Sequence, residues 1–156
     1  MKNYIIDDIK HFMNELLCNE KYDSFYMHEA RIKTALDYYI SGKINKNFFD
    51  NDRMEMYDKQ EYILWKDIKN IIYDLMKGER LPISFKIVLM FNNDNIERLI
   101  EMNNIPMASD DITALFINIY YENNELLLTT GTSVKIFTLD KSLEHVWDDT
   151  VDKYYI

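Results

Sequence analysis

The spacing of apolar residues changes along this chain of 156 residues, and that change constrains the fold more than any other feature. Asp7 or Asp8 can accept hydrogen bonds from the free N–H groups of a first helical turn. The apolar residues that follow recur with the helical period and share one face: Ile9, Phe12, Met13, Leu16 and Leu17. Between residues 31 and 40 the period is two, which is typical of a strand with one buried face.

The same two periods predict the remaining elements. Three further helices are expected around Trp65, Leu99 and Trp147, the second of them capped by Asp94. Both tryptophans should be buried, and Gly78 is well placed as the C′ residue of the helix that carries Trp65. Strands are expected at 25–29, 31–40, 43–49, 83–91, 112–121, 126–130 and 134–139, with a short one possible before the first helix.

The connections follow from the polar residues between these segments. Turns are expected at 41–42, 122–125 and 130–132, and residues 50–61 should form a surface loop. Residues 83–91 are apolar on both faces, which predicts a central strand covered on both sides.

These elements predict an α+β fold, with a largely antiparallel twisted sheet of six to seven strands and four helices packed mainly on one face. At 156 residues the chain fits a single domain. Residues 1–78 and 79–156 both read as strand, helix, three strands and helix, and GKINKNFFD in the first half echoes GTSVKIFTLD in the second. One interpretation is a pseudo-duplicated unit, and the other is a chance likeness of two α+β halves.

Charge restricts the partners. The chain has 18 Lys and Arg against 27 Asp and Glu, a net charge of −9. Affinity for nucleic acid comes from cations that displace counterions from phosphates, so an acidic chain is repelled from DNA, RNA and anionic membranes on average. We expect neither a nucleic-acid partner nor a membrane partner, and we interpret the acidity mainly as a source of solubility.

Three observations predict a cytoplasmic protein. A single cysteine, Cys18, cannot form an internal disulfide. Asp7 and Asp8 interrupt the first apolar residues too early for a secretion signal. No apolar run approaches the roughly 18 residues that a membrane-spanning helix needs.

No motif identifies a reaction or a cofactor. With 3 glycines in the chain, a glycine-rich phosphate loop is excluded. Asp50, Asp52 and Glu61 match positions 1, 3 and 12 of a calcium loop, but Met54 stands at a ligand position and Glu55 at the required glycine. We therefore expect no metal and no cofactor.

His28 is the one histidine with a suggestive neighbourhood, because Glu29 and Arg31 follow it. A histidine oriented by a carboxylate can act as a general base. Neighbouring strand residues point to opposite faces, however, so His28 and Glu29 can cooperate only if the strand bulges.

Tyrosine is the most unusual component, with 12 residues. The pairs Tyr38-Tyr39 and Tyr120-Tyr121 should each place one ring on either face of a strand. An outward ring favours a protein interface because it buries well while its hydroxyl stays hydrated. Cross-strand aromatic pairing within the sheet is the alternative explanation.

The sequence also resembles an uncharacterised family, a domain of unknown function found in small cytoplasmic proteins of low-GC Gram-positive bacteria. The resemblance rests on KGERLPISF at 77–85, SGKI at 41–44 and HVWD at 145–148, and it covers nearly the whole chain. It implies a compact bacterial cytoplasmic domain and no particular activity.

Three hypotheses for the function remain open. The first is a non-enzymatic interaction module, binding a protein partner or forming a homodimer through Tyr38, Tyr39, Tyr120 and Tyr121. The second is a small-molecule-binding protein or hydrolase that uses His28, Glu29 and Arg31. The third is an acidic competitor of a nucleic-acid-binding partner.

Overall fold

The computed structural model describes residues 1–156. The strands are β1 Asn3–Ile6, β2 Tyr26–Lys33, β3 Asp37–Ser41, β4 Ser84–Met90, β5 Ile112–Glu122 and β6 Glu125–Val134. The α-helices are α1 Ile9–Leu17, α2 Asn51–Tyr57, α3 Trp65–Met76, α4 Asn93–Met102 and α5 Ser142–Tyr154. Two short 3₁₀ helices are η1 Lys46–Phe48 and η2 Ser109–Asp111.

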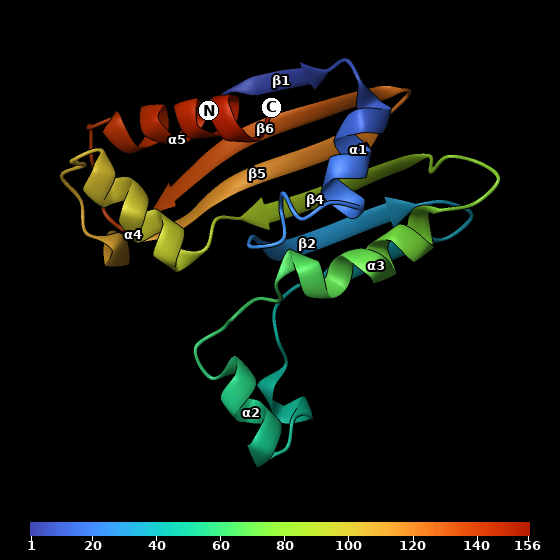
Figure 1. Ribbon diagram of the computed structural model, residues 1–156, viewed down its shortest axis with the longest axis horizontal. Coiled ribbons are helices and arrows are strands. Elements are labelled where there is room, and N and C mark those ends of the chain that lie inside the picture. The colour runs from blue at the N-terminus through green and yellow to red at the C-terminus, as the bar shows by residue number, and fades with distance from the viewer.

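All six strands form one antiparallel sheet in the order β1-β6-β5-β4-β2-β3 (Figure 1). The α+β class and a sheet of six strands are as predicted from the sequence. The predicted helix count of four is wrong, because there are five α-helices. None of these helices combines the length and hydrophobicity that crossing a bilayer requires.

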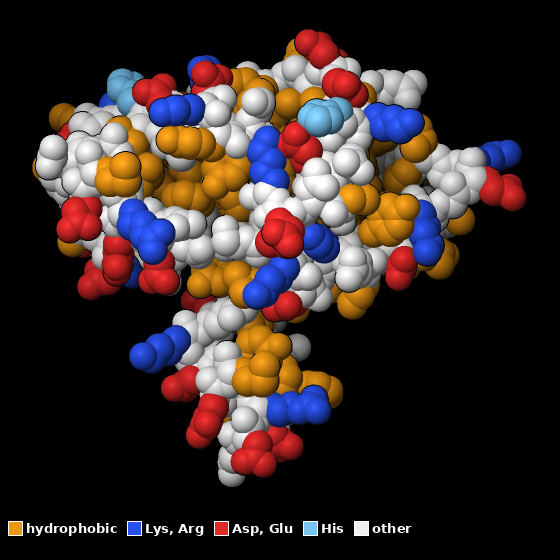
Figure 2. Space-filling view, viewed as in Figure 1, with side chains coloured by type: hydrophobic (Ala, Val, Ile, Leu, Met, Phe, Trp, Pro, Cys, Tyr) orange, Lys and Arg blue, Asp and Glu red, His pale blue; other side chains and the backbone are white.

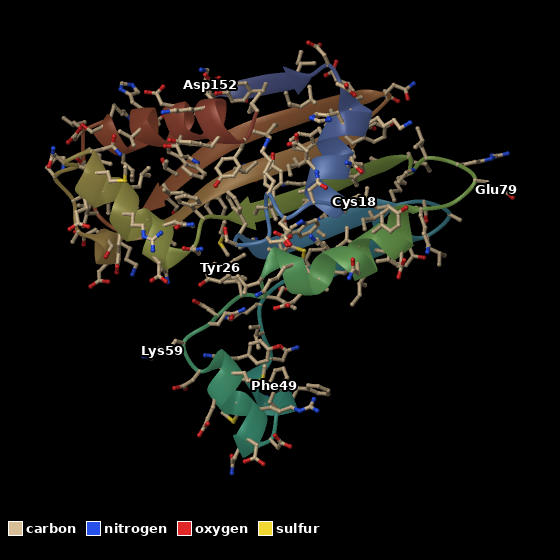
Figure 3. All side chains as sticks on the ribbon, in the orientation of Figure 1. Cys18, Tyr26, Phe49, Lys59, Glu79 and Asp152 are labelled. Atoms are coloured by element: carbon tan, nitrogen blue, oxygen red, sulfur yellow. The ribbon has the colours of Figure 1, made fainter.

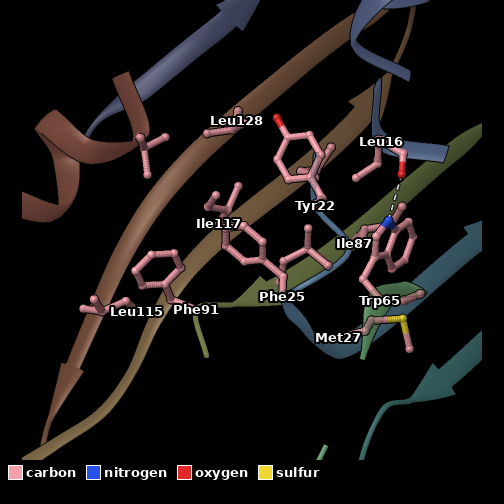
Figure 4. Close-up of a cluster of buried hydrophobic side chains, with 14 of the residues drawn as sticks. Leu16, Tyr22, Phe25, Met27, Trp65, Ile87, Phe91, Leu115, Ile117 and Leu128 are labelled. Atoms are coloured by element: carbon pink, nitrogen blue, oxygen red, sulfur yellow. Dashed lines mark hydrogen bonds between the residues drawn. The ribbon is translucent and has the colours of Figure 1, made fainter. Parts of the chain in front are cut away.

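The helices α1, α3 and α5 lie over one face of the sheet (Figure 1). Between helices and sheet lies the core, where Trp65 and Trp147 are fully buried, as predicted. Figure 4 shows Trp65 beside Leu16, where its indole Nε1–H donates to the Leu16 carbonyl oxygen at 2.8 Å. Trp147 Nε1–H donates to the carbonyl oxygen of Phe116 at 3.0 Å. Each tryptophan therefore fills the core and satisfies its single polar group.

Local chemistry accounts for several boundaries. Asp8 caps α1 by accepting from the His11 N–H at 3.0 Å, as predicted. Asn92, and not Asp94, caps α4. Between β5 and β6, Asn123 and Asn124 have φ of 53° and 60°. Positive φ at both central residues is the conformation that a tight hairpin turn needs, so the turn predicted at 122–125 is confirmed.

The region predicted as one strand over 31–40 is two strands, β2 and β3, and β2 also includes most of the predicted strand 25–29. The turn lies at residues 34–36, where the Thr34 N–H donates to the Leu36 carbonyl oxygen at 2.9 Å, and not at 41–42. Three loop residues leave the parity of the alternation unchanged, so Ile32 and Tyr38 are direct neighbours on the same face. The alternation of apolar residues therefore continues through the turn, and for this reason the sequence pattern did not reveal the boundary between β2 and β3.

Two predicted strands are absent. In segment 43–49 only Lys43 forms a bridge, to Tyr62, and η1 follows. Segment 134–139 is irregular after Val134, and Phe137 is 91% exposed. The turn predicted at 130–132 is wrong as well, because β6 runs through Gly131, which lies opposite Phe116. Alternation of apolar residues without a strand partner was not enough to make these segments strands.

Residues 43–62 form an arm that projects from the body of the protein (Figure 1). The surface loop predicted at 50–61 is largely α2, whose first turn is capped by Asp50. No residue of the arm is buried, and Phe48 is 82% exposed. Figure 2 shows hydrophobic side chains at the surface of the arm, and Figure 3 places Phe49 and Lys59 on it, away from the sheet.

The two halves share the order strand, helix, two strands, helix, with the arm added to the first half. The division of a single domain into two repeated halves stays a prediction. Gly78 follows the last helical residues of α3 but, like the other glycines, does not have positive φ. Lys77 is the C-cap residue of α3, so the predicted C′ position of Gly78 is confirmed, without the left-handed conformation that glycines commonly adopt there.

Candidate interaction surface on the open face of the sheet

The face of the sheet turned away from α1, α3 and α5 is here called the open face. Alternate residues of each strand contribute to it, and the strand register brings six of them into one line across the sheet. This central row consists of Tyr39, Arg31, Lys86, Tyr120, Leu127 and Ile5, in the order β3-β2-β4-β5-β6-β1.

The two tyrosine pairs divide between the faces. Tyr39 and Tyr120 belong to the open face and are 58% and 41% exposed, and Ile5 in the same row is 64% exposed. Tyr121 faces the core, where its ring stacks on Phe85 with centroids 5.2 Å apart. Tyr38 lies on the core side of β3 and is partly buried. Only Tyr39 and Tyr120 can therefore meet a partner on the open face, and that role stays a prediction.

Cations occupy the middle of the open face. The Arg31 guanidinium lies 4.8 Å from the centroid of the Tyr39 ring. Lys86 Nζ lies 3.9 Å from a carboxylate oxygen of Glu29, a long contact for an ion pair. Neither Arg31 nor Lys33 has a carboxylate oxygen within 4.0 Å. A chain with net charge −9 thus holds two cations here that no acid neutralises at close range.

These cations surround a shallow hollow of about 370 Å³. Its polar lining consists of Arg31, Lys33, Asp37, Ser84 and Lys86. The rings of Tyr39 and Tyr120 stand on its two sides, three inter-strand spacings apart, which is roughly 14 Å. The hollow is therefore cationic at its floor and aromatic at its rim.

The Tyr120 hydroxyl donates a short hydrogen bond to the carboxylate of Glu122, two residues along β5. This hydrogen bond to an acid raises the pKa of the Tyr120 hydroxyl above its ordinary value of 10.0. The phenol therefore stays neutral, and the ring is held against the open face by its own strand.

From the sequence, His28 and Glu29 could share a face only if their strand bulges, and β2 does contain a β-bulge at this point. The pairing of β2 with β4 shifts between Met27 and Glu29, so His28 is the extra residue. Its ring stacks on Tyr62 with centroids 5.2 Å apart and meets the ring of Phe116 edge-on at 6.0 Å. The bulge thus turns His28 toward the open face, where Glu29 also lies.

No hydrogen bond links His28 to Glu29 or to Arg31. His28 is engaged by two aromatic rings, Glu29 by Lys86, and Arg31 by Tyr39. A catalytic or ligand-binding role for the three residues together stays a prediction.

Lys86 is one of the residues of this surface that sequence reasoning missed. Its position in β4 was predicted to be covered on both sides, yet its side chain is 44% exposed. The central place of β4 in the sheet is confirmed, and Val88 and Met90 are buried on the open face, but no helix layer covers that face. A single lysine within the apolar run ISFKIVLMF was the available signal.

Comparison with known proteins identifies a family for this chain but gives no information on its activity. The model of a family of unknown function, DUF5721, matches residues 15–156. No curated protein and no solved structure matches the chain.

Proposed function

Because the chain belongs to DUF5721, a family of unknown function, we propose a function from its own surface: a non-enzymatic interaction module that self-associates through the open face. The observation that carries the proposal is the exposure of Tyr39, Tyr120 and Ile5 in one row of a sheet face without a helix layer. Aromatic rings and aliphatic side chains in such a row lose contact with water when a second surface covers them.

The charge pattern supports an interface over a purely solvated face. Neither Arg31 nor Lys33 has an acidic partner within the chain, and an incoming surface can supply one. Arginine and tyrosine are also the residue types that contribute most to binding at protein interfaces.

Sedimentation velocity of the intact chain over a concentration series tests this function. We expect a species of twice the 18.9 kDa chain mass at micromolar concentration. The double variant Tyr39→Glu/Tyr120→Glu should be monomeric, because it places carboxylates at the centre of the contact. Tyr73→Glu is the matched control, since Tyr73 is an exposed tyrosine of α3 on the helix side. A wild-type chain that stays monomeric at high micromolar concentration would contradict the proposal.

The hollow on the open face favours one second candidate, the binding of a small anionic molecule. Arg31, Lys33 and Lys86 supply positive charge and Ser84 a hydroxyl donor. Citrate and inorganic phosphate are suitable probes: either should raise the thermal midpoint of the wild-type chain and not that of Lys86→Gln. The hydrolase hypothesis for His28, Glu29 and Arg31 has no comparable support and stays a prediction.

Other parts of the proposal rest on the sequence alone. The setting is the cytoplasm of a low-GC Gram-positive bacterium, with no nucleic-acid partner, no metal and no cofactor. The third hypothesis, an acidic competitor of a nucleic-acid-binding partner, stays a prediction.

A further inference from the structure

We propose that the second copy docks on the open face about a two-fold axis that runs parallel to the strands and passes between β4 and β5. This arrangement rests on the self-association proposed above and specifies its geometry. The sheet has six strands, and this axis leaves three of them on either side. Two-fold symmetry is the commonest form of association between identical chains.

The axis fixes which strands meet. Two sheets packed face to face keep their strand directions within about 30° of each other. Rotation about the chosen axis places β4 over β5 of the second copy, β2 over its β6, and β3 over its β1. Residues in the same cross-strand row then face each other, and every contact occurs twice.

In the central row, this rotation places the cations of one copy over aromatic rings and aliphatic side chains of the other copy. Lys86 lies over Tyr120 of the second copy, which is a cation–π arrangement. Arg31 lies over Leu127, where its aliphatic stem can pack, and Tyr39 lies over Ile5. The exposed apolar side chains of the row are therefore covered by one another.

The neighbouring row supplies the acidic partners. In the order β3-β2-β4-β5-β6 it consists of Asp37, Lys33, Ser84, Glu122 and Glu125. Rotation places Lys33 over Glu125 of the second copy and Ser84 over its Glu122. Neither Lys33 nor Glu125 has an ion pair within its own chain. Each can therefore pair across the interface without breaking an existing bridge.

The two halves of the open face are complementary in charge more generally. On β2, β3 and β4 the open face has the cations Arg31, Lys33 and Lys86 against the carboxylates of Glu29 and Asp37. On β5 and β6 it has the carboxylates of Glu122 and Glu125 and no cation. A two-fold axis between these halves brings opposite charges together, which favours association of this pair of surfaces.

A two-fold axis across the strands gives the opposite result. Each strand would then lie over its own copy, so Lys86 would meet no carboxylate, because β4 has none on the open face. Glu122 and Glu125 would meet no cation, because β5 and β6 have none there. Like charges placed against each other, or buried without a partner, oppose association. The charges of the open face therefore select the axis parallel to the strands.

The size of the face sets the expected strength. Five inter-strand spacings and a strand of about seven residues span roughly 24 Å by 23 Å, which is about 550 Å² in projection for each copy. Stable interfaces bury about 800 Å² per partner. We therefore expect a reversible dimer with a dissociation constant in the micromolar range.

A charge swap tests the arrangement. Lys33→Glu and Glu125→Lys should each weaken dimerisation at least about tenfold, because each places like charges together at two symmetry-related positions. The double variant Lys33→Glu/Glu125→Lys reverses both charges and should return the dissociation constant to within about threefold of wild type. Lys66→Glu, at an exposed position of α3, is the control. Sedimentation velocity gives the dissociation constants, and thermal midpoints verify that every variant is folded.

The possible results separate this arrangement from the function on which it rests. Rescue by the double variant supports both. If the wild-type chain is monomeric, or if Tyr39→Glu/Tyr120→Glu still dimerises, the proposed function is wrong and the arrangement falls with it. If the tyrosine variant is monomeric but the charge variants dimerise like wild type, or the double variant is not rescued, only the arrangement is overturned.

Discussion

Gly42 packs against Met27 so closely that a Cβ atom added to the glycine would lie 1.7 Å from the Met27 carbonyl oxygen. Its N–H donates to the carbonyl oxygen of His28 at 2.9 Å, and its own carbonyl oxygen accepts from the Ile63 N–H at 2.9 Å. Met27 closes this network by donating to Ile63 at 2.8 Å. The base of the arm is therefore fastened to the bulge of β2 at a point where only a glycine fits.

Gly42→Ala should be strongly destabilising, because the new methyl group overlaps backbone that cannot move without breaking the bulge. We expect a loss of about 2–4 kcal/mol in the free energy of unfolding, measured by urea denaturation. Gly78→Ala is the matched control: its Cβ would have only the Arg80 carbonyl oxygen nearby, at 3.9 Å, and φ is not positive. That variant should be neutral or stabilised by up to about 1 kcal/mol. Equal stabilities for the two variants would show that the close approach at Gly42 is wrong.

The role of Gly42 could not be predicted from the sequence. A glycine after an alternating segment predicts a turn, and the sequence placed one at 41–42. The requirement at Gly42 is a long-range one: the glycine meets Met27, 15 positions earlier, at a bulge that no local pattern announces. Close approach between distant segments is tertiary information, whereas residue spacing reports only local geometry.

The spacing of apolar residues predicted structure best for helices and strands that pack one face against the core. The buried faces of α1, α3 and α5 and the central place of β4 followed from residue spacing, because burial of an apolar stripe is what spacing records. The spacing was misleading where a segment has no neighbouring strand to pair with, as in segment 134–139. On the candidate surface it identified two tyrosine pairs but could not say which ring faces outward, since that depends on the register with the core.

Replacement of the two buried tryptophans tests the packing of the helix layer. Trp65→Ala and Trp147→Ala should each cost about 3–5 kcal/mol, because each removes a large, fully buried side chain and leaves a cavity. If either variant is too unstable to purify, Trp→Phe at the same position removes less volume and should still cost about 1–3 kcal/mol through the lost indole hydrogen bond.

Phe48→Ala is the control for the tryptophan variants, since Phe48 is an exposed aromatic residue of the arm. Its free energy of unfolding, measured by urea denaturation, should stay within about 0.5 kcal/mol of wild type. A change below about 1 kcal/mol for either tryptophan-to-alanine variant would show that the corresponding helix does not pack as described.

Tyr22 should make the protein sensitive to alkaline pH. Burial raises the pKa of its hydroxyl above the ordinary value of 10.0, with a further contribution from the negative charge of Glu15. The folded state therefore favours the neutral phenol. This contribution to stability is fully present below pH 10.0 and is lost as the pH rises above that value.

Tyr22→Phe should remove this alkaline loss. The variant gives up the hydrogen bond from the Tyr22 hydroxyl to the Tyr155 carbonyl oxygen, 2.8 Å long, so at neutral pH it should be less stable by about 1 kcal/mol. Above pH 10.0 its free energy of unfolding should fall less steeply with pH than that of wild type. Tyr73→Phe, which removes the hydroxyl of an exposed tyrosine, is the control variant. Identical slopes for wild type and Tyr22→Phe would show that Tyr22 does not titrate differently in the folded state.

The open face also allows a sharp test of whether the chain binds nucleic acid. It presents three cations, Arg31, Lys33 and Lys86. Three phosphate contacts predict that affinity falls with about the 2.7th power of salt concentration, or about 40-fold between 50 and 200 mM. The net charge of −9 opposes even this weak attraction. We therefore expect no retention of duplex DNA or RNA in a gel-shift assay at physiological salt with micromolar protein. A sub-micromolar shift that disappears in Lys33→Glu/Lys86→Glu would instead identify the open face as a nucleic-acid surface, and the protein-interaction proposal would have to be replaced.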